Sequence, residues 1–221
     1  MTLSPIKPSQ NNNTHNSEYL KQIPLFRLKT TIQKPLFRKV PETFDVIYAD
    51  PPWDYDQRTF LNKKANNTGS ASDHYPTMTL QQLCCMNVRK LRAKNSIMYM
   101  WTTGPQLQAS IQLMIAWGYT YKTVAFVWDK IRLNPGYYSM SQTEFVIVGT
   151  HGAIPKPRGR RNVRQFLQSK RTRHSQKPHE IRRRIEIMHP EQTKLEMFAR
   201  DTSSGWFSHG NQCQGSVQLP L

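Results

Sequence analysis

Long apolar runs, paired cysteines and metal-binding spacings are missing from this chain of 221 residues. No stretch approaches the roughly twenty apolar residues that a membrane-spanning helix needs, and the polar start lacks the apolar centre of a secretory signal. Cys84, Cys85 and Cys213 form no CxxC or Cys/His set, so we expect free thiols and no metal. These absences predict a soluble protein without a membrane partner, cytoplasmic if it is prokaryotic or phage-encoded and nuclear if it is eukaryotic.

Acidic residues are also scarce, with 14 Asp and Glu against 31 Lys and Arg, for a net charge of +17. The excess is clustered, since residues 155–184 hold twelve Lys and Arg against Glu180 alone, and residues 1–40 hold seven against Glu18. Such clusters suit a polyanion, because each cation that neutralises a phosphate releases counterions. We therefore expect a nucleic-acid partner, and a solvated basic face without a specific partner is the alternative.

The composition is that of a folded protein, because hydrophobic residues make up 37% of the chain and aromatic residues 10%. Residues 1–40 are polar and dotted with proline, which predicts a basic, partly disordered N-terminal extension. Residues 41–221 then form one domain of ordinary size. The sequence leaves three states of assembly open: a monomer, a homodimer and a complex with a partner subunit.

Apolar runs alternate with amphipathic segments along this domain. The pattern predicts strands over 44–49, 96–101, 121–128, 144–149 and 194–198. It predicts a helix from the cap Thr79 to Leu91, one opened by Pro105 with Ile115 on its buried face, and one opened by Pro178. Strands that alternate with helices favour an α/β fold with a mostly parallel sheet, in which ligands bind at the carboxyl ends of the strands.

Asp50-Pro51-Pro52-Trp53 follows directly after the first expected strand. The Asp50 carboxylate and the Pro51 carbonyl can each accept a hydrogen bond from an exocyclic amino group, and Trp53 offers a stacking face. The lone pair of an aromatic amine is delocalised into its ring, so the amine reacts only when acceptors orient it in line with an electrophile. These residues therefore fit a pocket for the amino group of adenine, and a rigid turn is the alternative.

Six further segments follow this one in order. They are Trp101-Thr102-Thr103-Gly104, Trp117-Gly118-Tyr119, Glu144-Phe145-Val146-Ile147-Val148-Gly149, His174-Ser175-Gln176-Lys177-Pro178, Leu195-Glu196-Met197-Phe198-Ala199-Arg200 and Gly210-Asn211-Gln212. Together the seven resemble the adenine-N6 methyltransferase family that includes the catalytic subunit of the eukaryotic messenger-RNA adenosine methyltransferase and short DNA-methylating members from bacteria and phages. The resemblance covers residues 44–212.

The resemblance implies a Rossmann-like methyltransferase of the permuted type, in which the catalytic motif precedes the cofactor-binding strand, with S-adenosylmethionine as cofactor. Asp50 would hold the target amino group and lie near the methionine end of the cofactor, while Pro51, Pro52 and Trp53 would shape the base pocket. Lys177 would pair with the cofactor carboxylate. Arg200, Asn211 and Gln212 would contact the cofactor's ribose and adenine.

Several residues are candidates for holding the nucleic acid. By the same resemblance Glu144 would lie near the target base, and Tyr55 beside Trp53 is a further candidate for contact with it. The polar stretches 54–76 and 129–142, which we expect to be loops, are candidates for base extrusion and sequence reading. Phosphates would bind the basic segment, through Lys156, Arg158, Arg160, Arg161, Arg164, Lys170, Arg171 and Arg173.

The chain departs from the family pattern in places. Ala199 replaces the glycine of the messenger-RNA enzyme, Asp201-Thr202 replaces its His-Asn pair, and no zinc fingers precede the domain. The last difference favours DNA over RNA as substrate. The alternatives are an RNA adenine-N6 methyltransferase, a catalytically silent nucleic-acid-binding subunit, and a basic α/β binding protein without enzyme activity.

Overall fold

The computed structural model describes residues 39–54, 77–136, 138–153, 159–171, 176–210, 213 and 217–219. All of these lie in one compact unit, Lys39–Leu221. The predicted N-terminal extension falls almost entirely outside the described residues, so the domain boundary near residue 40 stays a prediction. None of the described helices is long and apolar enough to cross a membrane.

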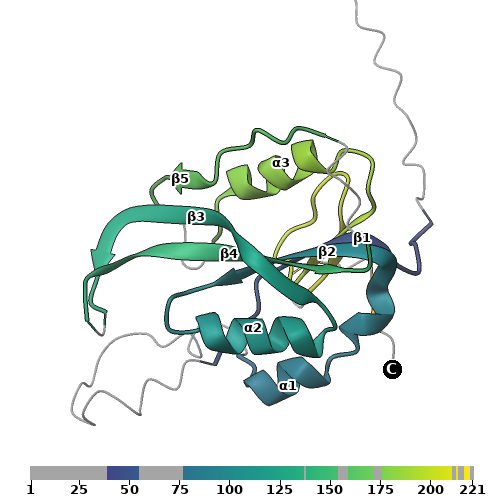
Figure 1. Cartoon of the computed structure of the whole chain (residues 1–221), viewed down its shortest axis with the longest axis horizontal. Helices are drawn as coiled ribbons and strands as arrows, with labels where there is room; N and C mark the ends of the chain where they lie inside the picture. Colours follow the sequence, from purple (N-terminus) through teal and green to yellow (C-terminus); the bar gives the residue numbers. More distant parts are fainter. Residues whose placement is uncertain are drawn as a thin grey trace, which may run out of the picture. The chain divides into compact units, whose positions relative to one another are not determined.

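Strands and helices alternate over the first part of the chain, and runs of three and of two consecutive strands follow (Figure 1). The strands are β1 (Phe44–Ala49), β2 (Arg92–Thr102), β3 (Thr120–Asn134), β4 (Ser141–His151), β5 (Phe166–Gln168), β6 (Lys194–Met197) and β7 (Phe207–His209). The helices are α1 (Leu80–Cys85), α2 (Leu107–Ala116) and α3 (His179–Met188), with a 3-10 helix over Val88–Leu91.

The strands form one seven-stranded sheet in the order β5-β3-β4-β2-β1-β6-β7. Only β4 runs against its neighbours, β2 and β3, and the remaining pairs are parallel. This is the predicted α/β fold with a mostly parallel sheet, of Rossmann-like type. Because β4 is reversed, its first residues lie at the same edge of the sheet as the carboxyl ends of β1 and β2.

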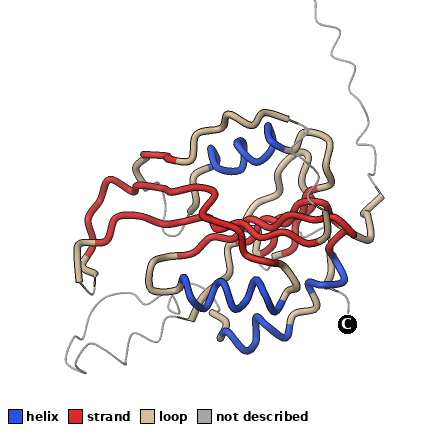
Figure 2. The backbone as a smooth tube through the Cα atoms, in the orientation of Figure 1, coloured by secondary structure: helices blue, strands red, loops and turns tan. Residues whose placement is uncertain are grey.

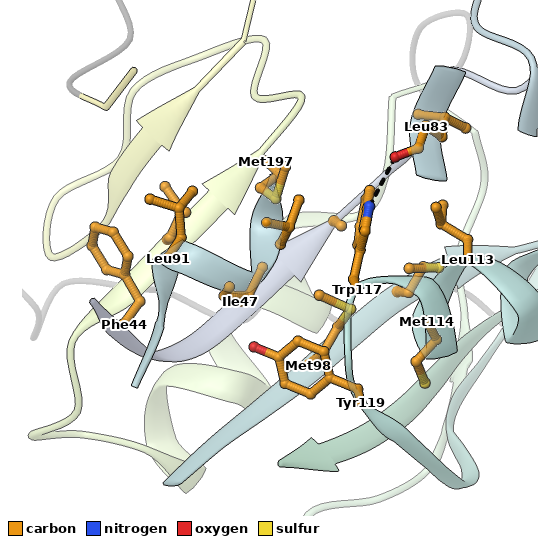
Figure 3. Packing of buried hydrophobic residues seen from close by; sticks show 14 of the residues in the cluster. Phe44, Ile47, Leu83, Leu91, Met98, Leu113, Met114, Trp117, Tyr119 and Met197 are labelled. Carbon is orange, nitrogen blue, oxygen red and sulfur yellow. Dashed lines mark hydrogen bonds between the residues drawn. The ribbon is translucent and has the colours of Figure 1, made fainter. Parts of the chain in front are cut away.

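Helices cover both faces of the sheet (Figure 2). On one face, α1 and α2 pack against apolar side chains of β1 and β2, and the Trp117 indole N–H donates to the Leu83 carbonyl at 2.9 Å (Figure 3). On the other face, Ile181 and Ile185 of α3 pack against a cluster that includes Tyr99 and Trp101. Two buried layers therefore hold β1 at the centre of the fold.

The helix cap at Thr79 is confirmed. The Thr79 hydroxyl accepts from the Gln82 backbone N–H at 3.3 Å, and the Gln82 side chain accepts from the Thr79 N–H at 2.9 Å. This reciprocal pair is a capping box. The predicted continuous helix to Leu91 is wrong, because α1 ends at Cys85 and a separate 3-10 helix follows.

Three other expectations differ from the structure. The segment 129–142, expected to be a loop, belongs largely to a β-hairpin in which Asn134 pairs with Ser141. Polar residues can extend these strands because ladder hydrogen bonds satisfy the backbone whatever the side chain. The short strands β5 and β7 were not expected, and Ile115 of α2 is 56% exposed rather than buried.

Candidate active site

The sheet topology brings three separate segments to one edge. Asp50 follows β1 at its carboxyl end, Glu144 lies near the start of the reversed strand β4, and Lys177 directly precedes Pro178, the N-cap of α3. In sequence these residues are far apart. The fold brings them together at the carboxyl edge of the parallel strands. Ligands bind at this edge in sheets of this kind.

Lys177 lies between the two carboxylates. Its Nζ is 3.0 Å from Asp50 Oδ1 and 3.1 Å from Glu144 Oε2. The other oxygen of Glu144 is 3.3 Å from Nζ of Lys130, on β3. Asp50 is the most open of the four side chains at 28% exposed, and Lys130 is the most buried at 9%. Positive and negative charges therefore alternate along the cluster, and its most accessible end is Asp50.

Burial and charge act against each other in this cluster. Burial raises the pKa of Asp50 above its ordinary value, and Lys177 opposes that rise. Burial would raise the pKa of Glu144 too, but Lys177 and Lys130 outweigh it and hold that pKa below its ordinary value. Burial would lower the pKa of Lys177, but the two carboxylates outweigh it and raise that pKa. The neighbouring charges therefore favour the ionised forms of Glu144 and Lys177, whereas at Asp50 they only offset part of the effect of burial.

An aromatic side chain lies next to the Lys177 ammonium. Its Nζ lies 5.3 Å from the centre of the Trp101 ring, within the range of a cation–π interaction. The Trp101 indole N–H donates to the Tyr48 hydroxyl at 2.5 Å, and both residues are buried in the face covered by α3. In the structure Trp101 is thus both a core residue and a direct neighbour of Lys177.

The Asp50-Pro51-Pro52-Trp53 segment makes a tight turn. The Pro51 carbonyl accepts from the Trp53 N–H at 2.9 Å, so one of its two lone pairs is already used. Trp53 is only 6% exposed and packs in the core, which contradicts the expectation that its ring offers a stacking face. Its indole N–H has no hydrogen-bond partner in the described part of the chain.

A bridge between Trp53 and Met78 closes the ends of the polar stretch that we expected to be a functional loop. The Met78 N–H donates to the Pro52 carbonyl at 2.8 Å, and the Asp54 N–H donates to the Met78 carbonyl at 3.0 Å. The intervening residues 55–76, including Tyr55, lie outside the described residues. Whatever their conformation, both of their ends are attached next to Asp50.

The predicted cofactor residues are only partly described. Arg200 follows β6, and its charge lowers the pKa of Asp50, so the two lie near one another. Asn211 and Gln212 lie outside the described residues. Gly210, just before them, passes so close to Ala199 that an added Cβ would lie 2.1 Å from its carbonyl oxygen. This close approach requires glycine at position 210.

The basic segment contacts both strand β3 and helix α3. Strand β5 pairs with β3, and Nη1 of Arg184 in α3 donates to the carbonyls of Arg164 and Phe166 at 2.7 and 3.0 Å. Five of the predicted phosphate-binding residues are exposed here: Arg160, Arg161, Arg164, Lys170 and Arg171. The other three, Lys156, Arg158 and Arg173, lie outside the described residues.

Lys130 is the site residue that sequence reasoning missed. It was assigned to a polar loop, but the structure places it on β3, 8% exposed, against Glu144. The signal available in the sequence is weak, because Asp129-Lys130 interrupts an apolar run in the way a strand end does. Only the pairing of β3 with β4 brings the two side chains together.

This arrangement offers charges of both signs, held in place before any ligand arrives. The ammonium of Lys177 has three N–H donors, of which two are used by carboxylates in the described residues. Asp50 has a second oxygen, Oδ2, beyond the one that meets Lys177. The site can therefore accept hydrogen bonds from an amino group and donate one to a ligand carboxylate at the same edge.

The chain matches the MT-A70 family over residues 44–212. The type II methyltransferase M.MunI of Mycoplasma sp is 47% identical over 208 residues, which cover 87% of this chain and 89% of that protein. The MT-A70-like N(6)-adenosine-methyltransferase of Arabidopsis thaliana is 29% identical over 78% of this chain, and the human catalytic subunit METTL3 is 26% identical over 78%. The chain spans 24% and 28% of those two longer proteins. With the resemblance of its ordered motifs thus confirmed, the chain belongs to the MT-A70 family of adenine-N6 methyltransferases.

Proposed function

We propose that this protein transfers a methyl group from S-adenosylmethionine to the exocyclic N6 amino group of adenine in DNA. The observation that supports it most is the placement of Lys177 between Asp50 and Glu144, at 3.0 and 3.1 Å, on the carboxyl edge of the sheet. One cation shared by two carboxylates at a ligand-binding edge is costly to bury without a role. That makes a structural function alone a poor account of the cluster.

The residues fit the amino-acid end of the cofactor. Its carboxylate suits the remaining N–H of Lys177, and its ammonium suits a carboxylate such as Asp50. Arg200 adds a second positive charge near Asp50. When bound, the cofactor supplies a methyl group made electrophilic by its sulfonium. We assign Lys177, Asp50 and Arg200 to its binding, with Asn211 and Gln212 as further candidates from the family resemblance.

Asp50 orients the target nitrogen. Its carboxylate accepts an N–H from the adenine amino group, and we assign the second N–H to the unused lone pair of the Pro51 carbonyl. Two acceptors in fixed positions draw the nitrogen toward tetrahedral geometry and aim its lone pair. Lys177 favours the ionised form of Asp50, which keeps it an acceptor. The nitrogen becomes cationic as it takes the methyl group and then releases a proton to the Asp50 carboxylate or to solvent, so no strong base is required.

We take the substrate to be DNA because the bacterial relative of matching length is named a type II methyltransferase. The exposed cations of the basic segment suit a phosphate backbone but do not separate DNA from RNA. An RNA substrate is therefore the near alternative. A silent subunit is disfavoured, because Asp50 and Lys177 are both retained and in contact.

The test is methyl transfer from labelled S-adenosylmethionine to matched duplex DNA, single-stranded DNA and RNA, with N6-methyladenine identified by mass. We expect transfer to DNA, and a fall of roughly 100-fold or more in Asp50→Asn, which keeps the shape but loses the anionic acceptor. Glu42→Gln is the matched control, because Glu42 is an exposed carboxylate just before the start of β1, whereas Asp50 directly follows its end. We expect it to retain full activity.

Three outcomes would contradict the proposal. Asp50→Asn with more than a tenth of normal activity would remove Asp50 from catalysis. Transfer to RNA alone would replace DNA as the substrate. Binding of cofactor with no transfer to any nucleic acid, by the unaltered protein, would favour the silent subunit.

A further inference from the structure

Exposed apolar side chains gather at the end of the β3–β4 hairpin. We call residues 131–140 the hairpin tip; residue 137 is outside the described residues. Ile131, Leu133 and Met140 are 47%, 54% and 55% exposed, and Tyr138 is fully exposed. Of the seven large hydrophobic residues exposed in the described part of the chain, these four lie in the tip. Figure 1 shows the hairpin reaching beyond the rest of the sheet.

The base of the hairpin is held firmly. Asp129 Oδ1 accepts from the backbone N–H of Ile131 at 2.7 Å and from the Gln142 side chain at 2.9 Å, and Oδ2 accepts from the Gln168 side chain at 2.8 Å. One carboxylate thus ties β3, β4 and β5 together where the tip begins. These hydrogen bonds therefore fix the direction in which the tip projects from the sheet.

Ile131 has an unusual backbone conformation. Its φ of +64° lies in the left-handed region, which a β-branched residue rarely adopts. Packing of the side chain does not explain this backbone conformation, since the side chain is 47% exposed. An exposed isoleucine in a strained position contributes little to folding, so its apolar surface is more readily explained by what it contacts outside the protein.

The tip continues directly from the candidate active site. Ile131 follows Lys130, and Glu144 lies on the strand that returns from the tip. Leu133 is three residues beyond Lys130, whose ammonium lies 3.3 Å from Glu144. A group held by the start of the tip would therefore lie only a few residues along the chain from the candidate active site.

Charge favours a nucleic acid over a second copy of the chain. The tip contains Arg132 and no acidic residue, and the exposed cations Lys170 and Arg171 directly follow the pairing of β5 with β3, where the Ser169 N–H donates to the Asp129 carbonyl. Two copies that met through this surface would place like charges together, whereas a phosphate backbone would neutralise them. Phe166 of β5, 54% exposed and paired beside β3, extends the apolar surface toward those cations.

We propose that the hairpin tip enters duplex DNA beside the target adenine and replaces the stacking that the base loses when it moves to Asp50. This inference rests on the proposed function. An adenine inside a duplex cannot reach a buried carboxylate unless it is extruded, and extrusion leaves a gap in the stack. Apolar side chains inserted at such a gap offset the lost stacking. Leu133 and Met140 are the residues we assign to this insertion, with Ile131 supporting them.

The test compares Leu133→Ser/Met140→Ser with the unaltered protein on three substrates of one sequence. The first is a normal duplex, the second has the target adenine opposite an abasic position, and the third is single-stranded. We expect the methylation rate on the normal duplex to fall by at least about tenfold, since unassisted extrusion costs a few kcal/mol, and the other two rates to change less than about threefold. Ile115→Ser is the matched control, because Ile115 is equally exposed but lies on α2.

A second measurement reports extrusion itself. With 2-aminopurine at the target position, binding of the unaltered protein to the duplex should raise fluorescence, and the double variant should raise it far less. Calorimetric titration with S-adenosylmethionine establishes that the variant is folded and binds cofactor normally.

The inference is overturned if the variant loses the same factor on all three substrates, or if it matches the unaltered protein on the normal duplex. A dimer that becomes monomeric in the variant, measured by sedimentation, would instead assign the tip to contact between copies. Failure of the unaltered protein to methylate any DNA would overturn the proposed function, and the inference with it.

Discussion

Lys177 determines the charge balance of the site at the scale of single residues. It contacts Asp50 and Glu144 through one ammonium, while Lys130 contacts Glu144 from the other side. Without Lys177, Asp50 would keep no cation within contact distance among the described ion pairs, and only the smaller effect of Arg200 would oppose burial and the negative charge of Glu144. A buried carboxylate in that position takes up a proton more readily.

We predict that Lys177→Met moves the acid limb of the pH–activity profile to higher pH. The profile moves in this direction because the pKa of Asp50 rises when Lys177 is lost. A higher pH is then needed to ionise the Asp50 acceptor. The affinity for S-adenosylmethionine should also fall at least about tenfold, since a charge-assisted contact is lost. The measurements are kcat/KM between pH 5 and 9 and calorimetric titration. Lys122→Met, an exposed lysine near the start of β3, is the control. An acid limb at the same pH as in the unaltered protein would contradict this role.

At the scale of elements, helix α3 positions Lys177, which lies directly before its N-cap. Arg182 of α3 forms an ion pair with Glu196 of β6 at 2.7 Å, with the two side chains 16% and 13% exposed. Burial raises the pKa of Glu196, and Arg182 opposes that rise. The Trp206 indole N–H also donates to Glu186 of the helix at 2.7 Å. These contacts fix α3 against the sheet.

Arg182→Met is predicted to lower the free energy of unfolding by about 3 kcal/mol, because Glu196 is left buried without its partner. Urea unfolding at pH 7 measures the change. The double variant Arg182→Met/Glu196→Met should recover much of the loss, since no unpaired charge remains. Arg183→Met is the control, because Arg183 is 64% exposed and pairs only on the surface. A double variant less stable than Arg182→Met would show that the ion pair does not account for the effect.

At the scale of the whole molecule, five exposed cations lie in one segment, residues 159–171. The segment begins at the end of α3, where the Arg160 N–H donates to the Ile187 carbonyl, and continues into β5, which pairs with β3. This distribution would guide a nucleic acid toward Asp50 before any base is recognised. Affinity that arises in this way falls steeply with salt.

We predict that replacing Arg160, Arg161 and Arg164 with Gln reduces the slope of log K against log salt by roughly two to three, about 0.9 for each lost phosphate contact. Fluorescence anisotropy with a labelled duplex between 50 and 300 mM NaCl measures it. Lys94→Gln/Lys122→Gln is the control, since these exposed lysines lie near the starts of β2 and β3, away from the carboxyl edge. An unchanged slope in the triple variant would remove the basic segment from phosphate binding.

Local pattern was sufficient for much of this protein. The apolar run before Asp50, the cap at Thr79 and the helix after Pro178 were all predicted correctly, because burial and capping depend on residues close in sequence. The family, the fold class and the candidate site residues also follow from ordered motifs. The sequence by itself thus determined the type of fold, the adenine-N6 methyltransferase family and the basic character of one segment.

Tertiary structure decided the rest. The hairpin of β3 and β4, the contact of Lys130 with Glu144, and the burial of Trp53 all depend on which strands are neighbours. Strand pairing joins residues far apart in sequence, and ladder hydrogen bonds allow polar residues to form strands that their own propensities do not predict. For the same reason, the Lys177 ammonium contacts two carboxylates that are distant in sequence only once the sheet has formed. The apolar hairpin tip likewise lies beside them only in the folded sheet.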